Sequence, residues 1–250
     1  MIAQFITDSG IVVPAISTAQ MREVDRIAIE ETGPNLFQMM ENAGRNLALS
    51  AMEMLGNRGR DASVVVLAGT GGNGGGGICA ARHLANHGIT VRLCITDPDR
   101  LDVVPALQRG IFLSTPGTEV GPTALGQAPV DLILDALIGY SLHSAPRGIA
   151  RDLILWANDR DVAILSLDVP SGVNSTSGDV PGEHVAATQT MTLALPKSGL
   201  LPHRTGALVL ADIGIPSGVY ERLSLSYRTP FDHRYRVPLK VFSPPPGHKQ

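Results

Sequence analysis

Two aspartates and a lysine lie where apolar, strand-like segments end. Asp135 falls within LILDALIG, Asp168 is the last residue but one of VAILSLDV, and Lys197 follows TQTMTLAL. In open α/β sheets, ligands bind beyond the carboxyl ends of the strands, so these carboxylates are candidates for general acid/base chemistry or cation binding. Burying Asp135 among apolar residues is costly unless a cation or hydrogen bonds compensate. The alternative is that each carboxylate is only a turn former or a helix cap.

A glycine-rich stretch, GTGGNGGGG at residues 69–77, follows another apolar segment. Glycines let a ligand approach the backbone, and free N–H groups at the start of a helix expected from Ile78 would attract phosphate. The spacing G-x-G-x-x-G begins at Gly69, and Asp97 stands after the next strand, where a ribose-binding acid belongs. This favours a Rossmann-type oxidoreductase as one hypothesis, and a tight turn that binds nothing as another.

The elements that must position these residues alternate along the chain. Strands are expected at residues 63–69, 90–96, 132–139, 162–169, 188–195 and 206–215. Ser17 and Gln20 have capping-box spacing before one amphipathic helix, and further helical patterns cover residues 33–55, 78–87, 103–113 and 149–158. Continuous apolar strands interleaved with helices predict an α/β fold: a three-layer αβα sandwich with a Rossmann-like, mostly parallel sheet.

Composition limits the classes of function. The chain has 250 residues, 44% of them hydrophobic, which fits a single domain over residues 1–250, with a core at about 17–216 and a loose tail at 240–250. The net charge of -3 and an aromatic content of 4% argue against nucleic acid as a partner. The N-terminus lacks the pattern of a signal peptide, and no apolar run reaches the roughly 20 residues of a membrane span. We expect a soluble, cytoplasmic protein.

The two cysteines, Cys79 and Cys94, fall within predicted core elements. We interpret them as buried structural thiols in a reducing compartment. A disulfide or an active nucleophile is the alternative.

Five motifs, taken together, resemble the YjeF N-terminal family, the NAD(P)HX epimerases. They span roughly residues 17–216 in the family's order, whereas the oxidoreductase hypothesis explains only the glycine-rich stretch. The motifs are MENAG at 40–44, the glycine loop leading into AARHL at 80–84, DALIG at 135–139, DVPSG at 168–172 and PKSG at 196–199.

The resemblance implies an enzyme that interconverts the R and S epimers of hydrated NADH or NADPH (NADHX and NADPHX). It implies Asp168 as the general acid/base, and a monovalent cation, K⁺, held by Asn73, Asp135 and Ser171. It also implies a homodimer and a separate NAD(P)HX dehydratase in the same pathway. The implied substrate-binding residues are Gly72, Asn73, Gly74, Gly75, Gly76, Gly139, Tyr140, Ser141, Leu142, His143, Ser144, Ala145 and Asp168.

Four positions depart from the family's pattern. Gly72 stands where the pattern has Asn, and Gly76, Asn174 and Thr188 each stand where it has Asp. We expect these changes to remove polar contacts around one pocket. They motivate a second hypothesis: a divergent family member that acts on another small substrate or binds a nucleotide without turnover.

Three basic side chains near the same loops keep two interpretations each. His143 and Arg147 are either phosphate contacts or members of a solvated loop. Lys197 is either a ligand contact or a solubilising charge at the sheet edge. An RNA-associated scaffold is the weakest hypothesis, because the chain is acidic.

Overall fold

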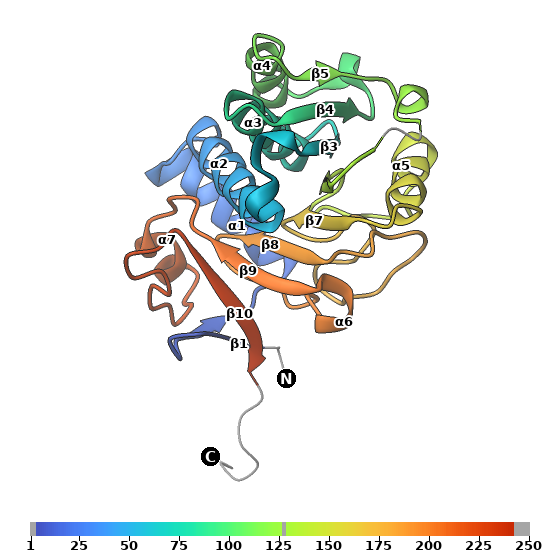
Figure 1. The fold of residues 1–250 in the computed structure, drawn as a ribbon. Coiled ribbons are helices and arrows are strands. Elements are labelled where there is room, and N and C mark those ends of the chain that lie inside the picture. The colour runs from blue at the N-terminus through green and yellow to red at the C-terminus, as the bar shows by residue number, and fades with distance from the viewer. Residues whose placement is uncertain (1–3, 127–128, 243–250) are drawn as a thin grey trace.

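A ten-stranded sheet forms the centre of the computed structural model, which describes residues 4–126 and 129–242 (Figure 1). The strand order is β2-β1-β10-β9-β8-β7-β6-β3-β4-β5. Strands β3 to β9 are parallel, whereas β10, β1 and β2 add an antiparallel edge. The strands are β1 (Gln4–Thr7), β2 (Val12–Pro14), β3 (Ser63–Ala68), β4 (Thr90–Ile95), β5 (Thr118–Glu119), β6 (Leu132–Ala136), β7 (Ala163–Leu167), β8 (Gln189–Leu193), β9 (Ala207–Ala211) and β10 (Arg236–Phe242).

Helices cover both faces of this sheet. The α-helices are α1 (Thr18–Ile27), α2 (Leu36–Leu55), α3 (Gly72–Asn86), α4 (Val103–Phe112), α5 (Gly148–Asn158), α6 (Pro202–Thr205) and α7 (Ser217–Arg222). A π-helical turn, η1 (Ala28–Thr32), extends α1, and short 3-10 turns lie at η2 (Gly56–Asp61), η3 (Pro98–Arg100) and η4 (Pro122–Ala124).

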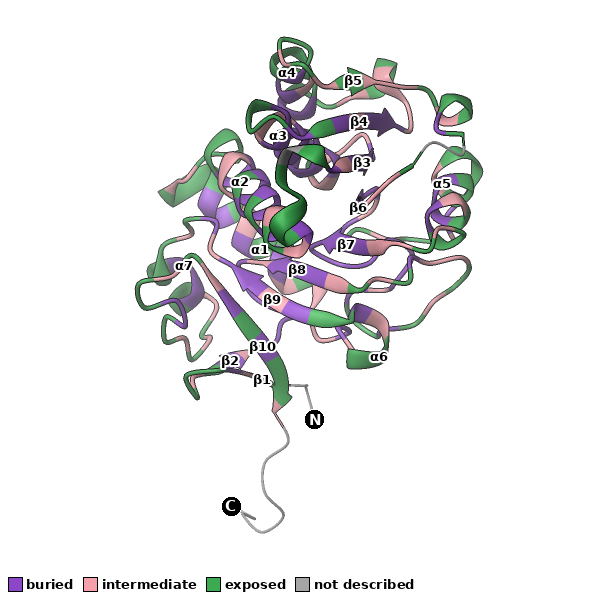
Figure 2. Cartoon of the chain, viewed as in Figure 1, coloured by how far each residue is buried: buried purple, intermediate pink, exposed green. Residues whose placement is uncertain are grey.

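The alternation of side chains along β3 shows the three layers. Val64 and Val66 pack in one apolar cluster with residues of α2 and α3. Val65 and Leu67 pack in another cluster with residues of α5. Both faces of the strand are therefore buried (Figure 2), which explains its continuous apolar sequence and confirms the predicted αβα sandwich.

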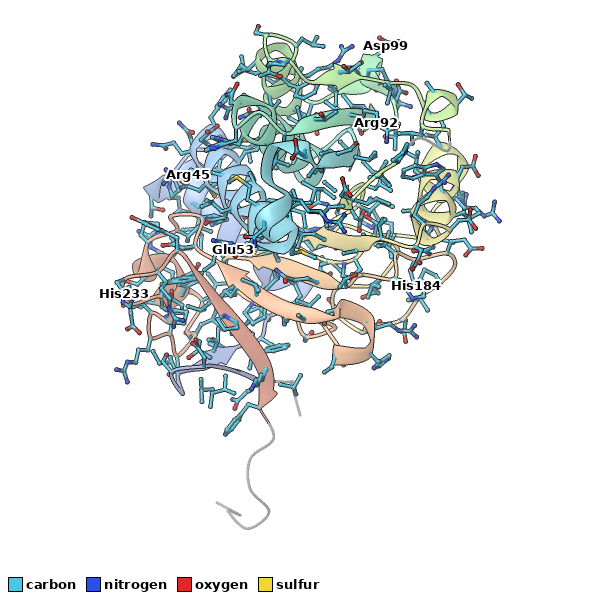
Figure 3. The ribbon with its side chains drawn as sticks, in the orientation of Figure 1. Arg45, Glu53, Arg92, Asp99, His184 and His233 are labelled. Atoms are coloured by element: carbon cyan, nitrogen blue, oxygen red, sulfur yellow. The ribbon has the colours of Figure 1, made fainter. Side chains whose placement is uncertain are left out.

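The sheet extends past both ends of the predicted core. Strands β1 and β2 precede Ser17, and β10 pairs with β9 and β1. Residues 240–242, predicted as part of a loose tail, lie in β10, with Val241 opposite Phe5; residues 243–250 lie outside the described residues. Glu53, labelled in Figure 3, lies near the end of α2. It pairs with Arg236 at 2.6 Å and so ties this helix to β10.

Helix α3 begins at Gly72, six residues before the predicted start at Ile78. Glycine is a poor helix former, so local propensity hides this first turn and a half. Tertiary packing requires the glycines: a Cβ atom at Gly74 would lie 1.8 Å from the Gly69 carbonyl oxygen, and one at Gly77 would lie 2.4 Å from the Ala136 Cβ. The glycines therefore bring α3 close to the sheet and to its own preceding loop.

None of the helices in the described residues is long and apolar enough to cross a membrane.

Candidate functional site

A cavity of about 230 Å³ opens at the carboxyl ends of β6, β7 and β8, where open α/β sheets bind ligands. The cavity is lined by residues of α1 and η1, by the N-terminal halves of α2 and α3, and by residues at or after the carboxyl ends of β6, β7, β8 and β9. The lining residues are Met21, Asp25, Ile29, Leu36, Met39, Met40, Ala43, Gly72, Asn73, Gly76, Gly139, Tyr140, Ser141, Leu167, Asp168, Leu193, Lys197 and Ile213.

A buried ion pair stands at one wall of this cavity. The Lys197 ammonium donates to the Asp168 carboxylate, and the two side chains are 1% and 5% exposed. Lys197 also donates to the Leu193 carbonyl at 3.0 Å, while the Leu193 N–H donates to Asp168 Oδ1 at 3.2 Å. The structure thus assigns Lys197 to the cavity, and excludes the alternative of a solubilising charge.

The backbone around the pair explains how it is positioned. Asp168 has φ of 67°, a left-handed conformation that Asp and Asn tolerate better than most residues. Lys197 is fixed from the other end of the sequence, because Ile16 forms a bridge to it: the Ile16 N–H donates to Pro196 O, and Ser198 N–H donates to Ile16 O, each at 2.9 Å. The ion pair therefore depends on contacts that are remote along the chain.

A second carboxyl group, Asp25 on α1, faces the same cavity. The Tyr140 hydroxyl donates to Asp25 Oδ2 at 2.5 Å. Burial raises the pKa of Asp25, and this effect outweighs the opposing hydrogen bond from Tyr140 and the charge of Lys197. Burial and the neighbouring Asp25 charge raise the pKa of Tyr140. Sequence reasoning missed Asp25, although its position four residues after the buried Met21 places a carboxylate on the inward side of an amphipathic helix.

Asp135 lies in β6 and is fully buried. Its Oδ2 accepts from the Ser166 hydroxyl at 2.8 Å and the Ser171 N–H at 2.9 Å, while its Oδ1 accepts from the Ser171 hydroxyl at 2.5 Å and the Leu137 N–H at 3.3 Å. Burial raises the pKa of Asp135, and the bonds from Ser171 oppose that rise. Hydrogen bonds from the protein therefore offset the cost of burying the Asp135 carboxyl group, which is one of the two explanations that the sequence allowed.

Oxygen donors gather next to Asp135. The Ser171 hydroxyl contacts Asp135, lies 3.2 Å from the Ile138 carbonyl oxygen, and accepts from the Ile138 N–H at 2.9 Å. Asn73 packs against Gly139, one residue further along the same segment, and its buried Nδ2 has no hydrogen-bond partner among the described residues. The oxygens of a carboxylate, a hydroxyl, a carbonyl and the Asn73 side-chain amide are a donor set that fits a hard cation, whereas the unpaired Asn73 Nδ2 is a hydrogen-bond donor and would face an acceptor atom of a ligand.

Behind the cavity, Glu41 joins α2 to α3. It accepts from Arg82 at 2.7 and 2.5 Å, and its Oε1 lies 2.9 Å from the His83 ring. Partial burial alone would raise the pKa of Glu41, but the bonds from Arg82 and His83 lower it to about 2. This network holds the two helices whose ends line the cavity.

Comparison with known proteins identifies the family. A model described as YjeF-related protein N-terminus matches residues 36–199. The chain belongs to this family. It is 51% identical over 240 residues to a protein of Dehalogenimonas lykanthroporepellens named NAD(P)H-hydrate epimerase, covering 96% of this chain and 98% of that one.

This YjeF-related chain is also similar to part of a longer enzyme and to a protein of known structure. It is 36% identical to the bifunctional NAD(P)H-hydrate repair enzyme Nnr of Salinibacter ruber, covering 84% of this chain but only 42% of that enzyme. A crystal structure of the yeast protein ynu0 superposes with a TM-score of 0.74 at 22% identity, covering 87% of this chain and 98% of the yeast one. The latter likeness confirms the fold.

Some of the predicted substrate-binding residues of the YjeF family line the cavity, and others do not. Of the predicted positions, the structure places Gly72, Asn73, Gly76, Gly139, Tyr140, Ser141 and Asp168 in its lining. Gly74 and Gly75 lie inside α3, where a Cβ at Gly75 would lie 2.4 Å from the Met40 sulfur. The segment from Leu142 to Ala145 lies outside the cavity lining, with His143 and Ser144 exposed and Leu142 and Ala145 half-buried. Contact of these residues with substrate stays a prediction.

The four departures from the YjeF pattern do not surround one pocket as expected. Gly72 and Gly76 line the cavity, but Asn174 and Thr188 do not. Asn174 Oδ1 accepts from two N–H groups of its own turn at 2.9 and 3.0 Å, and the Thr188 hydroxyl accepts from the Ile164 N–H at 3.1 Å. Both side chains therefore stabilise local backbone. At Gly76 a Cβ would lie 2.7 Å from Leu167 Cδ2, so a side chain there would require the end of the Leu167 side chain to shift.

Asp97, which the oxidoreductase hypothesis places on a ribose, instead caps η3. Its carboxylate accepts from the Asp99 N–H at 3.3 Å, and it is not part of the cavity lining. The glycine stretch is largely helical, and the cavity draws on residues from all five family motifs. Only the family assignment accounts for both observations.

Proposed function

We propose that this protein is an NAD(P)H-hydrate epimerase that interconverts the R and S epimers of hydrated NADH or NADPH. The observation that carries the proposal is the Asp168 carboxylate in a cavity at the carboxyl edge of the sheet, in a chain 51% identical along 96% of its length to a protein of that name. The reaction needs a group that gives and takes protons beside a bound nicotinamide ring, and Asp168 supplies one.

The chemistry at the ring defines what the cavity must do. In the substrate, C6 carries a hydroxyl group. Epimerisation requires that C6 lose this oxygen and regain one on the opposite face. Losing and regaining this oxygen requires proton transfer to the departing group and from the incoming water, and we assign this proton transfer to Asp168. Lys197 holds its carboxylate in place and supplies a positive charge beside it.

The start of α3 supports a nucleotide ligand. Its N-cap is Gly71, whose lack of a side chain leaves the first N–H groups of the helix without a side-chain cap. Gly72 and Asn73 place this end of the helix at the cavity. The helix dipole and these N–H groups favour a phosphate there.

A bound K⁺ forms part of this proposal. Asn73, Asp135 and Ser171 would hold it, and its charge would offset the buried carboxylate and support the loop that follows β6. Replacing KCl by N-methyl-D-glucamine chloride at constant ionic strength should lower Tm and activity, and added K⁺ should restore both. Asp135→Asn should abolish the K⁺-dependent part of Tm. Equal Tm and activity in the two salts would remove K⁺ from the proposal.

We also propose a partner enzyme for this protein. The Salinibacter ruber relative is named bifunctional and is more than twice the length this chain covers, which supports a dehydratase as the next enzyme to use the S epimer. The homodimer and cytoplasmic location stay predictions; sedimentation equilibrium tests the former.

The decisive test of function supplies the protein with the pure R epimer of NADHX and follows the S epimer by chromatography. Epimerisation above the spontaneous rate supports the enzyme. No acceleration, together with binding of NADPH by calorimetry, would favour the alternative of a nucleotide-binding protein without turnover.

A further inference from the structure

The cavity holds two carboxyl groups in contrasting surroundings. Asp168 pairs with the buried ammonium of Lys197. Asp25 pairs with the neutral hydroxyl of Tyr140 at 2.5 Å through its Oδ2. Among the described residues no hydrogen bond to the second oxygen of Asp25, Oδ1, is formed, so this atom remains available to a ligand in the cavity.

Burial favours the protonated form of Asp25, and the charges around it do not overturn that preference. From the segments packed against α1, it faces the Tyr140 hydroxyl, the Lys197 ammonium and the Asp168 carboxylate, and Tyr220 of α7 lies within its electrostatic reach. Lys197 is already neutralised by Asp168, so it offers Asp25 little net positive charge.

The two arginines next to Asp25 on α1 do not supply that charge either. Arg26 is bound to Glu23 at 2.8 Å and to Glu30 at 3.1 Å on the exposed side of the helix. Arg22 is exposed, and neither arginine lines the cavity. Asp25 is therefore a partly buried carboxyl group whose nearest partner is uncharged.

We propose that Asp25 is a second catalytic carboxyl group of this site: it protonates the departing hydroxyl of the substrate, Asp168 takes the proton from the incoming water, and Tyr140 positions Asp25. This assignment rests on the epimerase function proposed above. It deepens that function by dividing the acid and base roles between two residues from opposite halves of the chain.

The step balances as a loss and a regain of water. The N1 lone pair of the substrate forms the N1–C6 double bond as the C6–O bond breaks, and the departing oxygen takes the Asp25 proton to leave as water. Water then attacks C6 from the other face, the N1–C6 π electrons return to N1, and the Asp168 carboxylate accepts the proton. The reverse direction exchanges the two roles, and exchange with solvent restores the starting protonation state.

The division of roles follows from the electrostatics. Burial raises the pKa of Asp25, which keeps a larger fraction of it protonated as pH approaches neutrality. A carboxylate that is ion-paired with lysine, as Asp168 is, suits the base. Activity that requires protonated Asp25 is present below its pKa and is lost as pH rises through it.

The first test replaces Asp25 by Asn, which keeps the shape but cannot donate the acid proton. We expect kcat for R-to-S conversion to fall by about 10² or more, because general acid–base catalysis contributes about 10²–10⁴. KM should stay within about threefold of wild type if Asp25 acts mainly on the transition state. Glu23→Gln, on the exposed side of α1, is the matched control and should change kcat by less than about twofold, as is usual for exposed positions.

The second test separates positioning from structure. The Tyr140 hydrogen bond lowers the pKa of Asp25, so Tyr140→Phe should raise it. The alkaline limb of the kcat/KM profile should therefore move to higher pH in Tyr140→Phe, and Asp25→Asn should lose that limb. A purely structural role for Tyr140 would lower activity without moving the limb.

The outcomes distinguish this inference from the proposed function. A wild-type protein that does not accelerate epimerisation refutes the function itself. An active wild type whose Asp25→Asn variant, folded by circular dichroism, keeps more than a third of kcat and an unchanged alkaline limb overturns the role of Asp25 alone. If Asp25→Asn does not fold, an alkaline limb that stays in place in Tyr140→Phe overturns the assignment.

Discussion

Replacing Lys197 by Met should destabilise the protein strongly, because it leaves the Asp168 carboxylate buried without its cation. The two side chains are 1% and 5% exposed, so solvent cannot take over the role of either partner. Breaking one side of a buried ion pair costs about 3–5 kcal/mol. In a chain of this size each kcal/mol lowers Tm by about 2–4 °C, so a loss on the order of 10 °C is expected.

A double-mutant cycle separates the pair from general packing damage. Asp168→Asn keeps the left-handed backbone conformation, which Asn tolerates, but leaves the ammonium unpaired. The double variant with Lys197→Met removes both charges. It should be more stable than the sum of the single effects predicts by about 2 kcal/mol, within the range for residues in contact.

Urea unfolding followed by circular dichroism measures all four free energies of unfolding. Additivity within about 0.5 kcal/mol would show that the two residues do not depend on each other. A Lys197→Met variant as stable as wild type would contradict the buried pair itself.

Three further predictions concern the surroundings of the cavity. The pKa of Glu41 is lowered to about 2, so its contribution to stability is fully present above the unfolded-state pKa near 4.5 and is lost as pH falls toward 2. Calorimetry of Glu41→Gln should therefore show a smaller fall in Tm over that pH interval than wild type shows. Gly44→Ala should lower the free energy of unfolding by about 1–3 kcal/mol, because its Cβ would lie 2.4 Å from the Cys79 Cβ. Gly110 has open space around it, so the control Gly110→Ala should be neutral or stabilising. Equal effects of the two substitutions would refute the packing argument. Burial raises the pKa of Cys79 and of Cys94 to about 12, so native protein at pH 8 should resist iodoacetamide while urea-unfolded protein reacts at both, as mass spectrometry would show; rapid native labelling would contradict their burial.

Local sequence patterns predicted the strands that build the ligand edge of the sheet and the polar residues at their ends. Continuous apolar runs and the turns after them depend on neighbouring residues, so Asp135 and Asp168 could be placed at strand ends without a structure. The same patterns predicted both cysteines as buried thiols, and the structure confirms that Cys79 and Cys94 are buried and free. The helix capping box at Ser17 is also present, with the bonds expected of it.

Features that depend on contacts between residues far apart in the chain could not be predicted from the sequence. Strand β10 is paired with β1 from the other end of the chain, and no local signal reports that pairing. The early start of α3 depends on how closely Gly74 and Gly77 approach the loop and the sheet. Asp25 enters the site only because α1 packs beside the segment carrying Tyr140. Each of these depends on tertiary packing, which overrides propensity.

The departures from the family pattern were harder to interpret for the same reason. Asn174 and Thr188 look like lost carboxylates when only residue types are compared. Their side chains satisfy backbone N–H groups of a turn and of β7, a role that requires knowing which groups lie nearby. Gly72 has open space around its missing side chain, so it is the departure where a polar contact could have been lost without a packing reason.

The most direct test of the central claim is the rate at which pure R-NADHX becomes S-NADHX with wild-type protein and with Asp168→Asn, measured by chromatography against a protein-free control. We predict rapid conversion by the wild type, and a rate for folded Asp168→Asn lower by about 10² or more, the usual contribution of a general acid/base. Wild-type conversion no faster than the protein-free control would contradict the epimerase function, and full activity in Asp168→Asn would contradict the role of its carboxylate.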